Sequence, residues 1–265
     1  MVVITSNNRD IILDAVRGMY SHLANRPDDV FHFATGRRAC EYVGYSAEEL
    51  DPLPPTAIES FAGVAHPFRA HVIRPGDDVL DVGSGSGTDV LIASRLVGPT
   101  GSVIGLDMTR AMREKLEANA ARAGARNVRT VDGNCEEIPL PDASVSVVTS
   151  NGVLNLVPDK ERAVREIFRV LRPGGRIQIS DVVVEIPPSD ACRAEPQLWA
   201  ECIVGAVTRE RYLDLFREAG FEDLDVVQEV DYFAASPSED TRKVAASFAA
   251  HAVVIRGVKA EGAAS

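Results

Sequence analysis

The chain has 265 residues, of which 45% are hydrophobic and 25% charged, and this composition is typical of a globular protein with a sizeable core. Its formal net charge is −11 and its basic residues are scattered, which disfavours nucleic acid and anionic membrane surfaces as partners. The first ten residues do not resemble a signal peptide, no apolar run is long enough to cross a membrane, and the four cysteines form no CxxC pair, so we expect a cytoplasmic protein with free thiols.

Residues 1–77 predict a helical cap over a site rather than an independent domain. Apolar residues recur at helical spacing over 8–24. A capping box from Ser46 to Glu49 starts a further short helix, and three prolines cluster at 51–55.

From residue 78 onward, short apolar strands alternate with amphipathic helices. Such alternation predicts an α/β fold with a doubly wound, mostly parallel sheet that is covered on both faces. The expected strands are 78–82, 102–107, 127–131, 145–150, 175–184, 223–230 and 249–257, and the expected helices are 88–97, 109–123, 159–171, one near 190–205 and 208–219. We expect the C-terminal tail "KAEGAAS" at 259–265 to be disordered.

A glycine-rich loop directly follows the first strand of the predicted sheet, in the stretch "LDVGSGSGTD" at 80–89. Ligands of such sheets bind beyond the carboxyl ends of the strands, so this loop is expected to contact one. Its third glycine, Gly87, comes one residue too early for the nicotinamide fingerprint, and no Gly-Lys-Ser/Thr follows as in a phosphate loop. The spacing therefore disfavours a nicotinamide dehydrogenase.

Two aspartates indicate which ligand the loop holds. The carboxylate of Asp81 at the loop mouth would repel a pyrophosphate but would attract a cation. Asp107 ends the second strand about twenty residues beyond the loop, the spacing at which an acidic residue binds ribose hydroxyls. An adenosine with a cationic tail and no phosphates is S-adenosylmethionine, which we therefore expect as the cofactor.

With these residues in place, the chain resembles the class I S-adenosylmethionine-dependent methyltransferases from about residue 60 to 258. The motifs that carry the resemblance are "LDVGSGSGTD", "GLDMT", "GNCEEIPLPDASVSVVTSNGVLNL" and "EIFRVLRPGGRIQISDV". It implies an enzyme with a Rossmann-like, seven-stranded sheet whose last strand is antiparallel, and a methyltransferase domain over 78–258.

The same resemblance implies roles for nine residues. Asp81 would serve the methionine part, Gly83, Ser84 and Gly85 the backbone contact, Asp107 the ribose, Met108 the adenine face, Asn134 and Cys135 the adenine edge, and Asn151 the surroundings of the sulfonium. The family more often has an acidic residue at position 134. Three structural alternatives remain open: Asn151 and Gly152 as a tight turn, Met108 as core, and Asp107 as a helix N-cap.

Within this class, "SNGVLNLVPDKERAVREIFRVLRPGG" and the stretch from "ISDVVVEIPP" to "FREAGF" are similar to the arsenite methyltransferases. Their acceptor cysteines hold trivalent arsenic, which prefers thiolates. Cys202, on the candidate acceptor segment 186–207, matches one of them, whereas Gly152 stands where another is expected. One hypothesis is a three-thiolate site of Cys40, Cys192 and Cys202; the alternative is a related enzyme that methylates another small molecule.

The reaction would be an in-line displacement, for which a soft nucleophile such as a thiol or arsenic needs no general base. A hydroxyl or amine acceptor would need one, and His66 and His251 are the best candidates. Phe61, Phe68 and Trp199 are candidates for an acceptor pocket. No metal-ligand cluster is expected. A binding module that kept the fold but lost catalysis is the alternative from another functional class.

Overall fold

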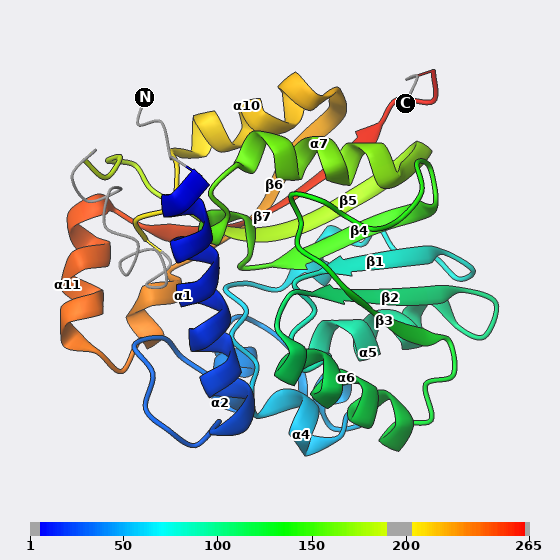
Figure 1. Cartoon of the computed structure of the whole chain (residues 1–265), viewed down its shortest axis with the longest axis horizontal. Coiled ribbons are helices and arrows are strands. Elements are labelled where there is room, and N and C mark those ends of the chain that lie inside the picture. Colours follow the sequence, from blue (N-terminus) through cyan, green and yellow to red (C-terminus); the bar gives the residue numbers. More distant parts are fainter. Residues whose placement is uncertain (1–5, 190–202, 263–265) are drawn as a thin grey trace.

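Seven strands form one sheet in the order β3-β2-β1-β4-β5-β7-β6, in a computed structural model that describes residues 6–189 and 203–262 (Figure 1). The strands are β1 Asp78–Val82, β2 Ser102–Asp107, β3 Val128–Asp132, β4 Val145–Asn151, β5 Leu171–Val183, β6 Phe221–Val230 and β7 His251–Lys259. Neighbouring strands from β3 to β5 pair in parallel, while β7 pairs antiparallel with both β5 and β6. The predicted doubly wound sheet with an antiparallel last strand is confirmed.

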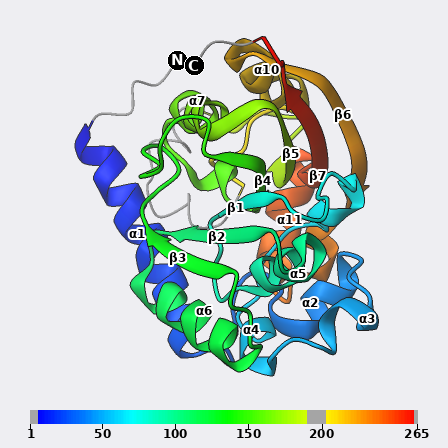
Figure 2. The same ribbon diagram turned by 90° about the vertical axis from the view of Figure 1, so that its right-hand side faces the viewer.

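Helices cover both faces of this sheet because its strands are apolar on both sides. Leu80 packs with the helices α7 and α10, whereas its neighbour Val79 packs with α5 and α6. The helices and turns of the described chain are α1 Ser6–Asn25, α2 Gly36–Tyr42, α3 Ala47–Leu50, α4 Pro55–Ile58, η1 Pro67–Ala70, α5 Thr88–Val97, α6 Arg110–Arg122, η2 Leu154–Leu156, α7 Lys160–Val170, α10 Arg209–Ala219, η3 Tyr232–Ala235 and α11 Glu239–Phe248. Figure 2 shows α5 and α6 on one side of the strands and α7 and α10 on the other.

The N-terminal elements pack on the α5 and α6 side and share its core. Leu23, Tyr45 and Phe61 belong to the same buried cluster as Val79 and Val103. The predicted capping box is confirmed, because the Ser46 hydroxyl accepts a hydrogen bond from the backbone of Glu49 while the Glu49 carboxylate accepts one from the backbone of Ser46. The cap and the sheet therefore bury one continuous hydrophobic core.

The boundaries of β5, β6 and β7 differ from the prediction, and two of these differences have a clear structural basis. β5 starts at Leu171, because Leu171 pairs with Val145 and Arg176 with Val147, so the glycine pair before Arg176 lies within an irregular stretch of the strand. β7 runs through Lys259, which was expected in a disordered tail. Its ammonium is buried and donates hydrogen bonds to the backbone oxygens of Phe168 (2.9 Å) and Leu171 (3.0 Å), which anchors it in the sheet.

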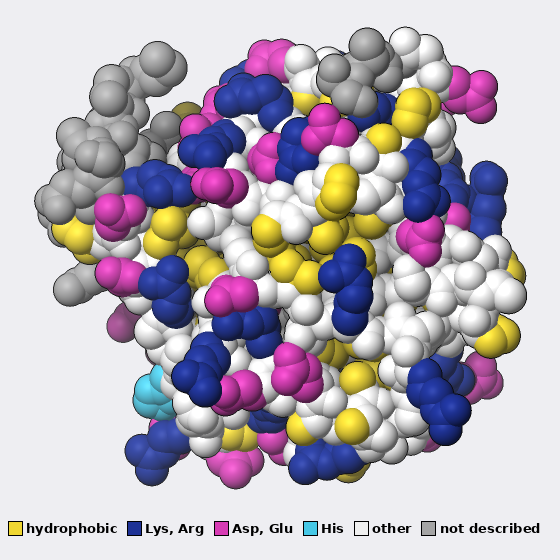
Figure 3. Space-filling view, turned by 45° about the vertical axis from the view of Figure 1, so that its right-hand side comes forward, with side chains coloured by type: hydrophobic (Ala, Val, Ile, Leu, Met, Phe, Trp, Pro, Cys, Tyr) yellow, Lys and Arg dark blue, Asp and Glu magenta, His cyan; other side chains and the backbone are white. Residues whose placement is uncertain are grey.

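Basic and acidic side chains lie interspersed on the face that Figure 3 shows. Exposed ion pairs of this chain, such as that of Arg110 and Glu114 (2.7 Å), each contribute little to stability. In the described part of the chain, no helix combines the length and the apolar character that crossing a membrane would require. The helix expected near 190–205 falls mostly on residues 190–202, which lie outside the described residues.

Candidate functional site

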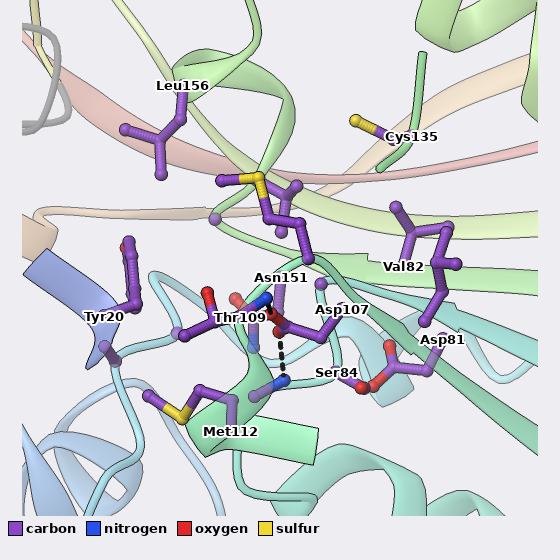
Figure 4. A pocket seen from close by; sticks show the side chains of 18 of the residues that line it. Tyr20, Asp81, Val82, Ser84, Asp107, Thr109, Met112, Cys135, Asn151 and Leu156 are labelled. Carbon is purple, nitrogen blue, oxygen red and sulfur yellow. Dashed lines mark hydrogen bonds between the residues drawn. The ribbon is translucent and has the colours of Figure 1, made fainter. Parts of the chain in front are cut away.

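A cavity opens at the carboxyl ends of β1, β2 and β4, where the predicted ligand-binding loop lies (Figure 4). Counted with the part that is open to solvent, the space between its walls is about 1030 Å³. Its walls come from the glycine loop, the strand ends, the segment 133–136, the cap and the helix α1. All nine residues predicted to bind the cofactor line this cavity: Asp81, Gly83, Ser84, Gly85, Asp107, Met108, Asn134, Cys135 and Asn151.

The glycine loop is held against the end of β2 by its own backbone. The amides of Gly83 and Ser84 donate to the backbone oxygen of Leu106 (2.8 and 3.0 Å), and the amide of Gly85 donates to the Asp107 carboxylate (2.9 Å). Gly83 has a φ of +72°, and a Cβ there would overlap the side chain of Val153. At Gly85 a Cβ would meet no described atom within 4 Å and would point into open space, so the loop backbone is accessible to a ligand.

Asp81 is a buried carboxyl group without a hydrogen-bond donor among the described residues. Only 2% of its surface is exposed, and it faces the cavity. Burial, together with the nearby carboxylates of Asp89 and Asp107, raises its pKa well above the usual range. The described lining contains no lysine, arginine or histidine, so nothing in the described wall compensates this group. The arrangement suits a cationic ligand and opposes a phosphate.

Asp107 both holds the glycine loop in place and lines the cavity. Its carboxylate accepts the backbone amides of Gly85 (2.9 Å) and Thr109 (2.7 Å), while burial raises its pKa. Thr109, not Asp107, occupies the N-cap position of α6. Asp107 therefore joins the end of β2 to the glycine loop, and the simple N-cap alternative does not describe it.

The segment after β3 lines another part of the cavity. The side-chain oxygen of Asn134 accepts the backbone amide of Glu136 (2.9 Å), which orders the turn. The thiol of Cys135 is buried, and burial raises its pKa to about 12, so it stays protonated at neutral pH. Met108 is half-buried beside the cluster of Ile12, Val16, Leu156 and Val204 and also lines the cavity, so it serves both as packing and as lining.

The side-chain amide of Asn151 ties the cap to the end of β4. Its oxygen accepts the backbone amides of Val64 (2.8 Å) and Ala65 (3.3 Å). Its nitrogen lies within hydrogen-bond distance of the backbone oxygen of Ala65 (2.9 Å), the Asp89 carboxylate (3.0 Å) and the Tyr45 hydroxyl (3.2 Å). Asn151 is thus a structural junction at the wall of the cavity.

Asp89 was missed by the sequence analysis although it lies in the quoted loop stretch. It is buried at the first turn of α5, lines the cavity and accepts a hydrogen bond from the Tyr45 hydroxyl (2.5 Å). Burial raises its pKa to about 6. The partner that explains its burial, Tyr45, is 44 residues away in the sequence, so only the folded chain reveals the pair.

The structure does not bring the predicted histidines to the cavity. His66 is 3% exposed, its Nε2 pairs with the Glu49 carboxylate (3.0 Å), and its ring packs edge-on against Tyr45; burial lowers its pKa. His251 starts β7, opposite Val183. Neither is among the lining residues. Neither histidine is therefore positioned to act as a general base for an acceptor bound in this cavity.

The cysteines are divided between core, cavity and the part outside the described chain. Cys40 is 0% exposed in the cap core, and its pKa is raised by burial, so it does not contribute a thiolate to the cavity. Cys192 and Cys202, with Trp199, lie outside the described residues.

Phe61 lines the cavity, whereas Phe68 does not. Among residues 6–189 and 203–262, no group of three or more His, Cys, Asp or Glu side chains is placed to hold a metal ion.

Comparison with known proteins identifies relatives of this architecture. The chain is 40% identical to the arsenite methyltransferase of Halobacterium salinarum over 186 residues, which cover 70% of this chain and 47% of that protein. It is 43% identical over 110 residues to the ubiquinone/menaquinone biosynthesis C-methyltransferase UbiE of Vibrio campbellii, which covers 40% of this chain and 41% of that protein. The chain thus spans about half the length of the curated relatives it matches.

A solved structure agrees with this relationship at the level of the fold. The crystal structure of an arsenic(III) S-adenosylmethionine methyltransferase from Chlamydomonas reinhardtii is 29% identical, with a TM-score of 0.61, over 86% of this chain and 74% of that one. The family model described as "Methyltransferase domain" matches residues 73–220, more than half of the chain, including the glycine loop, Asp107 and Asn151. The chain therefore belongs to the methyltransferase domain family, as its sequence motifs predicted.

Proposed function

We propose that this chain is an S-adenosylmethionine-dependent methyltransferase that methylates a small molecule with a soft nucleophile, a thiol or trivalent arsenic. The assignment of this cofactor rests on the buried carboxyl group of Asp81, which has no hydrogen-bond donor among the described residues and lies beside an accessible glycine backbone. A lining with four acidic and no basic described side chains suits a cationic sulfonium compound better than a dinucleotide. Relatives with S-adenosylmethionine in their names support the same cofactor.

We assign a part of this cofactor to each of several lining residues. Asp107 would bind the ribose and Asp81 the positively charged methionine part, with Met108 against the face of the adenine and Asn134 and Cys135 at its edge. This assignment is supported by their positions in the cavity wall. When bound, S-adenosylmethionine supplies a methyl group on a positively charged sulfur that a nucleophile takes by in-line displacement. The chain aligns the reactants and keeps water away from them.

We infer that the acceptor binds against the apolar wall of the cavity. It is lined by apolar or aromatic side chains from α1, the cap and the turn after β4: Leu13, Val16, Tyr20, Phe61, Val153 and Leu156. Of the carboxyl groups in the described lining, Asp89 already accepts hydrogen bonds from Tyr45 and Asn151. Because a soft nucleophile needs no base, it fits this wall better than a hydroxyl or an amine does.

Arsenite itself is the second candidate, supported by the names of the relatives. Gly152 occupies the position where a cysteine would be expected, and at its φ of +75° a side chain would press on Val64. Since Cys40 lies in the core, a metalloid site would depend on Cys192 and Cys202. A cofactor-binding module without catalysis is the remaining alternative.

A screen of cofactor consumption separates these three possibilities. We expect turnover with thiols or arsenite and none with phenols, quinols or amines. Cys202→Ser is expected to leave cofactor affinity intact, and it abolishes arsenite turnover if Cys202 holds arsenic, whereas the buried Cys40→Ala control retains it. Unchanged alkylation of Cys202 in saturating arsenite would contradict the arsenite candidate. Cofactor binding without turnover of any acceptor would favour the inactive module.

Cofactor affinity is expected to rise as the pH increases from 5 to 7. The pKa of Asp89 is raised to about 6 and that of Asp81 is raised well above its usual range, so both carry protons in mildly acidic solution. A bound cation favours the ionised carboxylates, so binding releases protons, and affinity increases by up to about tenfold per pH unit for each proton released. Calorimetry in two buffers of different ionisation enthalpy measures this release. Asp89→Asn should flatten the slope, and an affinity that is constant across this range would contradict the cation assignment.

A further inference from the structure

Helix α1 itself forms one wall of the cavity. It crosses the carboxyl ends of the strands, in front of them in Figure 1 and beside β3 in Figure 2. Leu13, Val16 and Tyr20 share one face of the helix at spacings of three and four residues, and all three line the cavity. In Figure 4, Tyr20 and Leu156 lie on the side of the cavity opposite Asp81.

The N-terminal half of α1 lies outside the two large cores of the described residues. Ile12 and Val16 are buried against Leu156 and Val204, with Tyr20 and Met108 packed beside them, in a small separate cluster. Arg9 in addition forms an ion pair with the Glu136 carboxylate. Elements with few buried apolar contacts open locally at low cost.

Glu136 connects this attachment to the adenosine side of the cavity. Its carboxylate is 1% exposed, accepts the backbone amide of Asp159 (2.8 Å) and lines the cavity next to Cys135. Its own backbone amide donates to Asn134 (2.9 Å). The end of α1 is thus held by the same turn that the adenine is expected to contact.

The C-terminal half of α1 is anchored firmly. Leu23 and Ala24 are buried in the larger core. The ammonium of Lys115 donates to the backbone oxygen of Ala24 (3.1 Å) and pairs with Glu59 (2.7 Å). This end of the helix is joined to both α6 and the cap.

Gly18 lies between the two halves. A glycine inside a helix lowers its stability relative to alanine, and glycines are common where helices bend. Gly18 is exposed, and a Cβ there would meet no described atom within 4 Å, so close packing does not require a glycine at this position. Its effect on the structure is to weaken the helix between a loosely and a firmly attached half.

We propose that residues 6–17 are the gate of the cofactor pocket, which opens by bending at Gly18 and is latched by the Arg9–Glu136 ion pair. The inference rests on the proposed cofactor. The closed helix excludes water from the cavity, and the open one lets the cofactor enter and its product leave. The latch then controls rates of entry and exit more strongly than affinity, because it changes the population of the open state.

The test is a measurement of the association and dissociation rate constants of S-adenosylmethionine for the full chain, by surface plasmon resonance. Arg9→Ala removes the latch and leaves the buried Glu136 carboxylate without its cation, so it is expected to raise both rate constants by at least roughly fivefold. Gly18→Ala strengthens the helix without a clash and is expected to lower both, again roughly fivefold. Arg17→Ala, which removes an exposed ion pair with Asp14 on the same helix, is the matched control and should change neither.

Hydrogen exchange gives a readout that is independent of binding rates. Amides of residues 6–17 should exchange faster than those of 19–25 in the free protein, faster still in Arg9→Ala and more slowly in Gly18→Ala. Unchanged rate constants in both Arg9→Ala and Gly18→Ala, with normal cofactor binding, would overturn the gate. Failure of the unaltered chain to bind S-adenosylmethionine at all would instead contradict the proposed function.

Discussion

Replacing Asn151 by alanine is expected to lower the free energy of unfolding by about 2–4 kcal/mol and to disable the cofactor pocket. The substitution leaves the backbone amides of Val64 and Ala65 without their acceptor and deprives the buried Asp89 of one of its two donors. Buried groups without partners cost more than the hydrogen bonds contributed. The cap residues next to Phe61 then lose their attachment to β4. Denaturant unfolding and calorimetric titration with S-adenosylmethionine measure the two effects.

Asn127 provides the matched control for this substitution. Its side chain also joins several elements, accepting from the Ser94 hydroxyl (2.6 Å) and donating to the backbone oxygens of Gly98 (3.1 Å) and Gly101 (3.4 Å). It precedes β3, at the opposite end of the strands from the cavity, and is not among the lining residues. Asn127→Ala should therefore destabilise the fold while leaving cofactor affinity intact. Equal losses of affinity in the two variants would mean that Asn151 acts only through global stability.

Local signals were sufficient to predict the sheet and the residues that line the cavity at the strand ends. β1 could be recognised because its residues are apolar on both faces, and the following loop because three glycines alternate with small residues. The positions of Asp81 and Asp107 at strand ends follow from the same pattern, since parallel strands bring their carboxyl ends to one edge. These features depend on residues that are close in the sequence.

The cavity wall formed by α1 and the cap could not be predicted in the same way because distant residues build it. Tyr20 reaches the cavity from α1, and Tyr45 reaches Asp89 from the cap. No periodicity in the sequence indicates which face of α1 meets the strand ends. His66 illustrates the converse case: its sequence position just upstream of the first strand made it a candidate general base, but in the structure it is buried, pairs with Glu49 and packs edge-on against Tyr45.

Asp107→Ala is expected to weaken S-adenosylmethionine binding by about 1.5–3 kcal/mol, roughly a 10- to 100-fold increase in Kd. Two kinds of loss combine in this variant. The ribose would lose a charged hydrogen-bond acceptor, and the amides of Gly85 and Thr109 lose the two carboxylate oxygens that accept from them. Asp107→Asn separates these losses in part, because its single side-chain oxygen can still accept from Gly85 but carries no charge. An intermediate affinity for Asp107→Asn is therefore expected.

Asp132 tests whether this effect is specific to the cavity. It ends β3 directly beside Asp107 in the sheet, but its side chain is exposed and pairs with Arg113 (2.9 Å) outside the cavity lining. Asp132→Ala removes the same charge from the same edge, so a purely long-range electrostatic effect would weaken binding in both variants. We expect an unchanged Kd for Asp132→Ala, because salt screens exposed charges while Asp107 acts by direct contact. An unchanged Kd in Asp107→Ala as well would show that the ribose is held elsewhere, and the cofactor orientation inferred from the glycine loop would then be wrong.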